Sequence, residues 1–317
     1  MVNGIDPVKL LEILCCPKCK GTLAISTENA FYCRNCNNDY SFEKGIITFI
    51  KDDKRIRKTM LDWNNDAITD HILSAAAISK ENVKTPFVKL LTIPATEYLK
   101  HKVYLDLGCG YGRTLIPCSQ RGARISIGID ISSIMLSKCR EYCNKYKANC
   151  LLVNSDISEM PFQDNCVDVV YSAAVLLHLD KEMTTRTVNE VRRILKVGGK
   201  AFFYSSFPNK WAIWTLVQSP EYFLTEPIRH ILGFTQSETR IRRYTYSEVI
   251  HLFNNFPKKE ISPVNYKLFP ENIGPLRVPF SNKAKQLNKK FSKIMERVNN
   301  RLSAKLLANH FDVIVSS

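Results

Sequence analysis

Four cysteines near the start of the chain have the spacing of a metal site. They form two C-x-x-C pairs, Cys16 with Cys19 and Cys33 with Cys36, and thirteen residues separate the pairs. Zn²⁺ prefers four thiolate or imidazole ligands in a tetrahedron, and a hairpin that brings two such knuckles together supplies four thiolates. The alternative is a set of buried or reactive thiols without metal. Cys15 precedes Cys16 directly, and we expect it to be a small apolar neighbour. We therefore predict a structural zinc site.

Three glycines at alternate positions, Gly108, Gly110 and Gly112, follow a short apolar segment and open a helical pattern. Glycine lets the backbone approach a ligand closely, and the N-terminus of a helix presents amide N–H groups to a carboxylate. The spacing is G-x-G-x-G, whereas a dinucleotide-binding turn prefers G-x-G-x-x-G, so a nicotinamide oxidoreductase is disfavoured. Within the turn, Cys109 is expected to be a small packing residue rather than a nucleophile.

Three aspartates lie at or near the ends of predicted strands. Asp130 comes 24 residues after Asp106, and a carboxylate at that place in such folds accepts hydrogen bonds from both hydroxyls of a ribose. Asp156 would bind the exocyclic amine of an adenine, and Ile131 and Ile157 would cover the faces of its ring. Asp106 would anchor the glycine turn and an amine of the ligand. Structural alternatives stay open, because Asp156 could cap a helix and Asp106 could cap the turn.

From about Tyr98 to Phe207, the chain resembles class I S-adenosylmethionine-dependent methyltransferases. The similarity extends through residues 105–112, 155–162, 168–179 and 194–200, and it is greatest to the ubiquinone/menaquinone-type ("type 11") group. The resemblance implies that S-adenosyl-L-methionine is the cofactor. The cofactor-binding residues that it implies are Asp106, Gly108, Cys109, Gly110, Gly112, Asp130, Ile131, Asp156, Ile157 and Ala173.

The first fifty residues resemble a second family, on the segments Leu10–Gly21, Tyr32–Cys36 and Tyr40–Ile47. They are similar to the small zinc-ribbon activator subunit that partners tRNA, rRNA and release-factor methyltransferases. They are also similar to the N-terminal zinc unit of bacterial rRNA guanine methyltransferases. Those enzymes usually replace one ligand with histidine, whereas this chain keeps four cysteines. The resemblance implies a structural zinc ribbon that acts as a scaffold or recognition element.

Alternating strand and helix patterns must position these residues. The predicted strands are residues 103–107, 124–130, 150–154, 166–171, 200–205, 260–269 and 311–315. Predicted helices cover residues 60–78, 85–91, 133–146, 181–195, 211–217, 222–234 and 247–256, and one more runs from the glycine turn to about Arg121. Strands separated by helices of this length predict an α/β fold with a doubly wound parallel sheet.

The domain organisation follows from these patterns. We predict a zinc ribbon at residues 1–50, a linker with lead-in helices at 51–101, and a class I methyltransferase domain at 102–317. That domain would be a seven-stranded Rossmann-like sheet with helices on both faces. A basic helical insertion is predicted near residues 277–305.

The sequence says less about the methyl acceptor than about the cofactor. A general base is needed only if the acceptor loses a proton at attack, and no catalytic residue can be assigned. The candidates for the acceptor pocket are His178, Tyr204 and Trp211, with Trp214 and the stretch 222–246 as further aromatic and basic contacts. His178 lies among leucines, so a packed core histidine is an equal alternative.

Charge points to an anionic partner without identifying it. Forty-five Lys and Arg against thirty Asp and Glu give a net charge of +15, which favours RNA or an acidic membrane surface. Apolar residues at helical spacing, with basic residues between them, predict an amphipathic basic helix; they are Leu287, Phe291, Ile294, Val298, Leu302 and Leu306. An ordinary packed helix, RNA contact and contact with an anionic membrane surface are its three interpretations.

Several functional hypotheses remain open at this stage. A methyltransferase acting on RNA is slightly favoured over one acting on a small-molecule, quinone-like or lipid-like acceptor. A third hypothesis is a non-catalytic binding or activator protein that keeps the cofactor fold. No apolar stretch reaches the ~20 residues needed to span a bilayer. We expect a cytoplasmic protein whose eleven cysteines are reduced thiols or metal ligands.

Overall fold

The computed structural model describes two compact units of the chain. The described residues are 7–27, 30–50, 59, 61, 64, 99–212, 241–266, 272–273, 276–277, 281–296 and 308–317. The first unit comprises Met1–Ser172, Thr185–Ala201 and Ser316–Ser317, and the second comprises Ala173–Thr184 and Phe202–Val315. Each unit is described by itself below.

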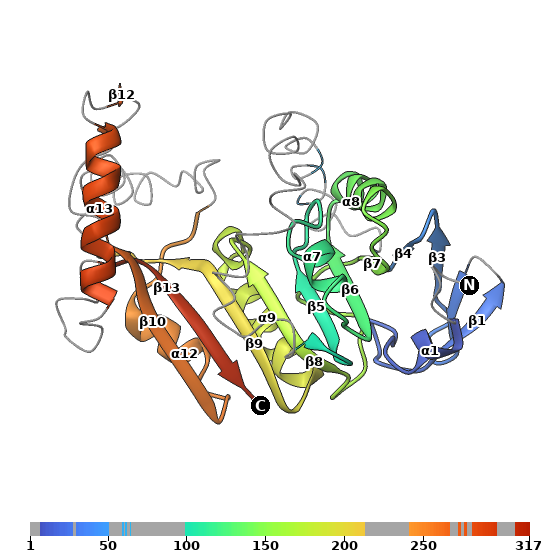
Figure 1. Ribbon diagram of the computed structural model, residues 1–317. Helices are drawn as coiled ribbons and strands as arrows, with labels where there is room; N and C mark the ends of the chain where they lie inside the picture. Colours follow the sequence, from blue (N-terminus) through green and yellow to red (C-terminus); the bar gives the residue numbers. More distant parts are fainter. Residues whose placement is uncertain are drawn as a thin grey trace, which may run out of the picture. The chain divides into compact units, whose positions relative to one another are not determined.

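The N-terminal part of the first unit is a small antiparallel sheet. After helix α1 (Pro7–Leu11) come β1 (Leu23–Thr27), β2 (Ala30–Cys33), β3 (Asp39–Glu43) and β4 (Ile46–Thr48), paired in chain order (Figure 1). Gly45, at φ +79°, makes the tight turn between β3 and β4.

The small sheet does not stand apart from the rest of the first unit. Its last strand, β4, pairs in parallel with β7 (Cys150–Asn154), with Ile46 opposite Leu152 and Thr48 opposite Asn154. The edge strand of a parallel sheet would otherwise present unpaired backbone groups. Pairing with β4 covers that edge, so the small sheet and the larger one are continuous.

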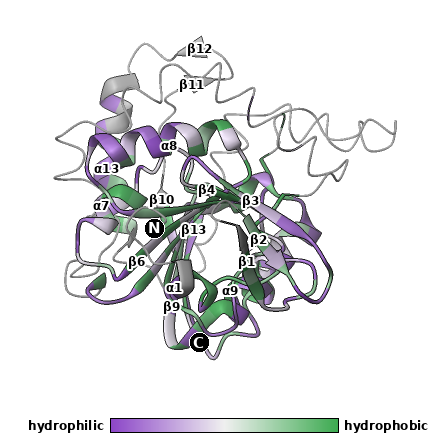
Figure 2. Ribbon diagram, turned by 90° about the vertical axis from the view of Figure 1, so that its right-hand side faces the viewer, coloured by the Kyte–Doolittle hydropathy of each residue, from purple (hydrophilic) through white to green (hydrophobic). Residues whose placement is uncertain are grey.

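Four parallel strands form the centre of the first unit, in the order β7-β6-β5-β8. They include β5 (Val103–Leu107), β6 (Ile125–Asp130) and β8 (Val167–Ala173). In Figure 2, hydrophobic (green) ribbon is visible among the strands. Every residue of β5, β6 and β7 is buried, as expected for a sheet covered on both faces. The strand order reverses between β5 and β8, and ligands of such sheets bind at the carboxyl ends of the strands at that point.

The helices between these strands differ in length from the prediction. Helix α8 (Ser133–Lys145) is as expected, and the Ser132 side chain caps it by accepting a hydrogen bond from the Met135 amide. The helix predicted from the glycine turn to Arg121 was wrong in extent: α7 covers only Leu115–Ser119. Gly110 and Gly112 have positive φ angles, whereas the residues of a right-handed helix have negative φ. The helix therefore cannot begin before the chain has passed Gly112.

A second correction concerns the start of β9, which directly follows α9 (Lys181–Ile194). Residues 195–199 were not predicted as strand, but β9 runs from Leu195 to Pro208 and includes Gly198 and Gly199. The backbone amide of Gly198 donates to Ser317 O at 3.1 Å, and the amide of Ser317 donates to Gly199 O at 3.2 Å. Pairing with Ser317 therefore extends β9 back through two glycines that, from local composition alone, mark the end of a helix.

The second unit contains three neighbouring strands in the order β9-β13-β10, namely the later part of β9, β13 (Ala308–Ser316) and β10 (Lys258–Tyr266). Its aromatic core includes Phe203, Phe207 and Phe253, whose ring centroids lie 5.2–6.2 Å apart. Helix α12 (Tyr246–Leu252) begins with a capping box between Thr245 and Glu248. All seven strands predicted from the sequence are present, so the expected α/β fold is confirmed.

The second unit also contains a long helix, α13 (Ser281–Glu296), and a short hairpin of β11 (Asn272–Ile273) and β12 (Leu276–Arg277). The basic helix predicted from the sequence is thus confirmed up to residue 296. The predicted helices near 60–78, 85–91 and 222–234 lie largely or wholly outside the described residues, as does most of 211–217. Among the described residues, no helix has the length and apolar character to cross a membrane.

Candidate functional site

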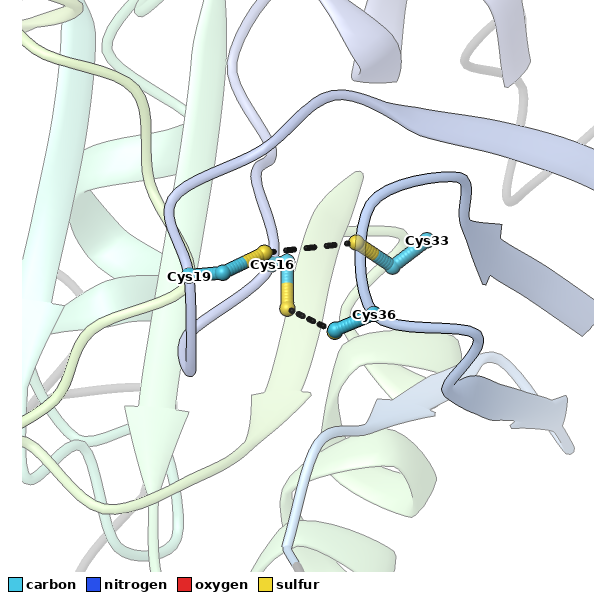
Figure 3. Close-up of side chains that lie close together, drawn as sticks. All are labelled: Cys16, Cys19, Cys33 and Cys36. Atoms are coloured by element: carbon cyan, nitrogen blue, oxygen red, sulfur yellow. Dashed lines mark hydrogen bonds between the residues drawn. The ribbon is translucent and has the colours of Figure 1, made fainter.

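The two C-x-x-C pairs meet at one point of the small sheet. Cys16 and Cys19 come from the loop after α1, and Cys33 and Cys36 come from the end of β2 and the following turn (Figure 3). Their four Sγ atoms all lie within 4.8 Å of one another. The Sγ atoms of Cys16 and Cys36 are 3.5 Å apart, as are those of Cys19 and Cys33. A tetrahedral zinc with bonds of about 2.3 Å needs sulfur pairs about 3.8 Å apart, so this donor set fits Zn²⁺.

Polar groups around the cysteines favour thiolates. The Asn38 side-chain amide donates to Cys36 Sγ at 2.7 Å, and the Tyr40 hydroxyl lies 3.0 Å from Cys16 Sγ. Tyr40 is buried and packs on Phe49, with ring centroids 4.7 Å apart. Hydrogen bonds from outside the ligand set orient metal ligands and stabilise their charge. The arrangement therefore suits a closed, structural metal site.

Cys15 lies outside the cysteine cluster, as predicted. Its side chain is fully buried, and its Sγ donates to Phe162 O at 3.0 Å. Burial raises the pKa of this thiol to about 11, although Lys20 and Arg193 partly oppose the shift. Cys15 is therefore a neutral packing residue.

The zinc knuckles are held against the larger sheet of the same unit by polar contacts that sequence reasoning missed. The Cys15 amide donates to Pro161 O at 3.0 Å. Lys20 Nζ donates to Glu190 Oε2 at 2.8 Å and to Met160 O at 3.0 Å. Arg193 also binds Glu190, at 2.8 Å, and these two cations lower the pKa of Glu190 despite its burial. Lys20 follows the first knuckle directly, but nothing local in the sequence shows that α9 supplies its acid.

The glycine turn directly follows β5 at the carboxyl edge of the sheet. The amides of Gly108 and Cys109 both donate to Ile129 O, at 2.9 and 3.0 Å, which ties the turn to β6. Gly112 has φ +81°, and a Cβ atom there would lie 2.6 Å from Cys139 Sγ. Only glycine fits this position without displacing the helix behind it. Cys109 is buried in the turn, as predicted for a packing residue.

Asp130 faces the glycine turn. Its Oδ2 accepts a hydrogen bond from the Gly110 amide at 2.8 Å, and its Oδ1 accepts one from the Ser132 amide at 2.9 Å. Burial raises the pKa of this carboxyl, whereas these two amides stabilise its charged form and oppose the shift. The sequence had predicted that Asp130 lies beside the glycine turn, and the structure brings the two together.

Asp106 is a second buried carboxyl at this edge of the sheet. It is 3% exposed, and its Oδ2 has no hydrogen-bond partner among the described residues. Burial and the negative charge of Asp130 raise its pKa to about 8, although the Leu115 amide partly offsets the shift. Two adjacent buried carboxyls favour a ligand that brings positive charge and hydrogen-bond donors. An ammonium group with neighbouring hydroxyls satisfies both requirements.

The remaining predicted cofactor residues in the first unit lie at the ends of β6 and β7. Asp156 is buried, and its Oδ1 accepts a hydrogen bond from the Ser158 amide at 2.8 Å, so it makes a local turn of the kind considered as its structural alternative. Ile157 is buried and Ile131 is half-buried. The Asn154 side chain donates to Asp130 O and Ile131 O, at 3.0 and 2.9 Å. Sequence reasoning missed Asn154. The only feature that could have indicated it is its position as a polar residue at the end of an apolar strand.

A second missed residue comes from the lead-in segment. Asn64 Oδ1 accepts a hydrogen bond from Ser132 Oγ at 2.7 Å. Ser132 is the N-cap of α8 and follows Asp130 by two residues. Asn64 therefore supports the backbone that carries Asp130, although no sequence motif surrounds it.

The proposed acceptor residues and Ala173 belong to the second unit. Ala174, at φ +56°, donates its amide hydrogen to Tyr204 O at 3.0 Å, which brings the end of β8 beside a buried tyrosine. His178 is half-buried in a short 3₁₀ turn (Leu176–His178). Trp211 is 53% exposed, and Lys210 Nζ lies 5.5 Å from its ring centroid. The described contacts thus join the Ala173 region with Tyr204 but do not bring Trp211 to them.

The 3₁₀ turn after β8 is fixed by Arg242 and Tyr244, which belong to the stretch 222–246 that the sequence offered for acceptor contact. The Arg242 amide donates to Leu177 O at 2.7 Å. The buried Tyr244 hydroxyl donates to Leu176 O at 3.3 Å and lies 3.2 Å from Thr184 Oγ1. The guanidinium of Arg242 stacks over the Tyr244 ring at 4.9 Å.

Comparison with known proteins finds two family models that match separate parts of the chain. Residues 105–199 match the family model of a methyltransferase domain, and residues 8–40 match that of Trm112p-like proteins. These ranges contain the glycine turn with its carboxylates and the four cysteines, respectively.

Two relatives with more than 30% identity are similar over about a third of the chain. A candidate methyltransferase of Encephalitozoon cuniculi is 36% identical over 109 residues, which are 34% of this chain and 46% of that protein. Sterol 4-C-methyltransferase strm-1 of Caenorhabditis elegans is 34% identical over 109 residues, or 32% of this chain and 30% of that protein. The chain thus spans less than half the length of these relatives. A solved methyltransferase from Archaeoglobus fulgidus shares 19% identity, covering 73% of this chain and 93% of that one, with a TM-score of 0.46.

Proposed function

We propose that this chain, which joins a Trm112p-like domain to a methyltransferase domain, is an S-adenosylmethionine-dependent methyltransferase. The observation that carries the proposal is the pairing of Asp130 with the glycine turn, next to the buried carboxyl of Asp106. This arrangement supplies hydrogen-bond acceptors for a ribose and a negative site for an ammonium group, and both are parts of one adenosyl amino acid.

The residues at the carboxyl edge of the sheet fit this cofactor. Asp130 would accept hydrogen bonds from the ribose hydroxyls, and Asp106 would hold the ammonium group. Gly110 and Gly112 would allow the backbone to approach closely. Asp156 would bind the adenine amine, with Ile131 and Ile157 against the ring, as the resemblance implies.

The cofactor supplies an electrophilic methyl group bound to a sulfonium. The chain's task is to hold the acceptor in line with that group and to exclude water. The buried strand ends and the glycine turn provide a rigid frame for this alignment, because Gly108 and Cys109 are tied to Ile129. We assign no general base, and His178, Tyr204 and Trp211 stay candidates for acceptor contact.

The Trm112p-like domain acts as a scaffold in this proposal. Its four cysteines hold a structural Zn²⁺, and β4 completes the edge of the sheet beside β7. The contacts of Cys15 and Lys20 reach Met160 and Pro161, shortly after Asp156 and Ile157. The metal-bound domain would thereby stabilise the segment that is proposed to bind adenine.

For the acceptor, we infer a small, lipid-like molecule, supported by the similarity to the sterol methyltransferase. RNA is the second candidate, and its support is the net charge of +15 together with the Trm112p-like domain. The two candidates predict methylation of different fractions of the same cell extract.

The test has two stages that use the full zinc-loaded chain. Calorimetric titration should show binding of S-adenosylmethionine and none of NAD. Asp130→Asn should weaken this binding at least tenfold, because hydrogen bonds to a charged group contribute about 1.5–3 kcal/mol each. Glu141→Gln, an exposed change on α8, is the matched control.

The second stage supplies a labelled methyl donor to lipid, RNA and protein fractions. Label in the lipid fraction supports the acceptor that we infer, and label in RNA replaces it with the second candidate. Absence of binding to S-adenosylmethionine by the folded chain would refute the proposed activity itself.

A further inference from the structure

One row of residues along α13 combines exposed aliphatic and basic side chains. Lys283, Leu287, Lys290 and Ile294 follow one another at spacings of four, three and four residues. In a helix with 3.6 residues per turn, this spacing places them in one line, about 16 Å long. Leu287 is 46% exposed and Ile294 is 60% exposed.

This row is distinct from the side of α13 that packs on its own unit. Phe291 and Met295 pack against the fully buried Ala308 of β13, and Asn288 is also buried. Those residues lie to one side of the exposed row on a helical projection. Figure 1 shows α13 alongside β10 and β13, elements of the same unit. The core of the unit therefore accounts for Phe291 and Met295 but not for Leu287 and Ile294.

The exposed side of α13 is strongly basic. Lys283, Lys289, Lys290 and Lys293 are all exposed, and none is within ion-pair distance of an acid in the part of the chain that the structure describes. Exposed aliphatic side chains are individually common on protein surfaces. Here two of them alternate with lysines in a single row, and lysines can extend their charges past an apolar surface on their long stems.

We propose that this row of α13 is a docking surface for a membrane that exposes anionic phospholipids on the leaflet facing the protein. Such a surface accepts aliphatic side chains at the acyl boundary and ammonium groups at the phosphates, so it satisfies both kinds of residue at once. An RNA backbone would satisfy the lysines but would leave Leu287 and Ile294 in contact with water. The alternation of the two residue types therefore favours the lipid surface. This inference concerns association and is independent of the proposed methyl transfer.

The experiment measures sedimentation of the full zinc-loaded chain with vesicles. Phosphatidylcholine vesicles are compared with equimolar phosphatidylcholine and phosphatidylglycerol. We expect at least tenfold stronger binding to the anionic vesicles. Leu287→Ser/Ile294→Ser should weaken this binding at least tenfold without changing the charge, since it removes two aliphatic anchors. Lys283→Gln/Lys290→Gln should weaken it about 25-fold, because each lysine near such a surface contributes about a factor of five.

Matched controls change the same residue types elsewhere. Ile25→Ser/Val197→Ser removes two other exposed aliphatics, and Lys100→Gln/Lys145→Gln removes two other exposed lysines. Both controls should bind anionic vesicles within about twofold of the unchanged protein. Thermal melting of every variant is measured in parallel, so that loss of folding is recognised.

Three results would overturn the proposal. The first is equal binding to neutral and anionic vesicles, or binding to neither. The second is unchanged vesicle binding after the Leu287 and Ile294 substitutions in a folded protein. The third is retention of single-stranded RNA that the lysine substitutions abolish and the aliphatic substitutions leave intact, without vesicle binding. That last result would identify α13 as a nucleic-acid surface.

Discussion

The buried carboxyl of Asp106 should make the protein less stable as the pH rises. Its pKa is about 8 in the folded chain and about 4 in an unfolded one. The folded state therefore holds a proton that the unfolded state has released over this range. Stability falls by at most about 1.4 kcal/mol per pH unit between these two values, to a ceiling of about 5 kcal/mol. Asp106→Asn cannot titrate and keeps an oxygen that can accept the Leu115 amide hydrogen, so it should remove this part of the pH dependence.

The same substitution should impair cofactor binding. The ammonium group of S-adenosylmethionine pairs with the ionised carboxyl, so binding near pH 7 should release close to one proton from Asp106. Below pH 8, affinity should rise up to tenfold per pH unit as the carboxyl ionises. Asp106→Asn should bind at least tenfold more weakly and release no such proton. We thus expect one change to stabilise the unliganded protein and to weaken its function, a known trade-off at binding sites.

The assay is thermal or urea unfolding of the zinc-loaded protein without cofactor, from about pH 5.5 to 8.5, with Glu141→Gln as an exposed control. The stability gap between Asp106→Asn and the unchanged protein should widen with pH up to about 8 and then level off. Calorimetry in two buffers of different ionisation enthalpy counts the released protons. Parallel pH profiles for the two proteins, or equal proton release, would refute the assigned electrostatics of Asp106.

Three further predictions concern the glycine turn and the metal domain. Gly112→Ala should destabilise the protein by about 2–4 kcal/mol and weaken cofactor binding, because φ is +81° and the new methyl group would lie 2.6 Å from Cys139 Sγ; an unchanged melting temperature would contradict this. Cys33→Ser should lower the zinc content below one per chain and destabilise the whole first unit by roughly 3 kcal/mol or more, seen by elemental analysis and by melting. A full loss of metal without a change in melting would show that the ribbon is not a scaffold. Lys20→Met should cost about 1–2 kcal/mol through its bonds to Glu190 and Met160, whereas the exposed Lys18→Met should cost almost nothing in the same urea titration.

Local patterns predicted the elements of this fold well, with errors at their ends. The strands from 103 to 171 were predicted to within two residues, because their apolar runs are bounded by glycines and polar residues. The start of β9 was mispredicted, since Gly198 and Gly199 indicate only a helix stop in the sequence but pair with Ser317 in the folded chain. Hydrogen bonds to a residue more than a hundred positions away leave no trace in a local window.

For the candidate sites too, local sequence patterns predicted some features, whereas contacts between distant residues could not be predicted. The spacing of Cys16, Cys19, Cys33 and Cys36 was sufficient to predict their convergence, because two knuckles joined by a hairpin have few other arrangements. The contribution of Asn64 to the support of Asp130 could not be predicted. A single asparagine in a polar segment has no periodicity and no motif.

The amino-acid sequence alone indicated the cysteine cluster, the glycine turn and its aspartates, because each of these depends on residue type and short spacing. Only the tertiary structure decided that β4 joins the sheet beside β7, that Lys20 meets Glu190, and that burial beside Asp130 raises the pKa of Asp106. It also decided which side of α13 the core leaves exposed. These features depend on which distant segments pack together, and packing sets both the partners of a side chain and the dielectric environment of its charge.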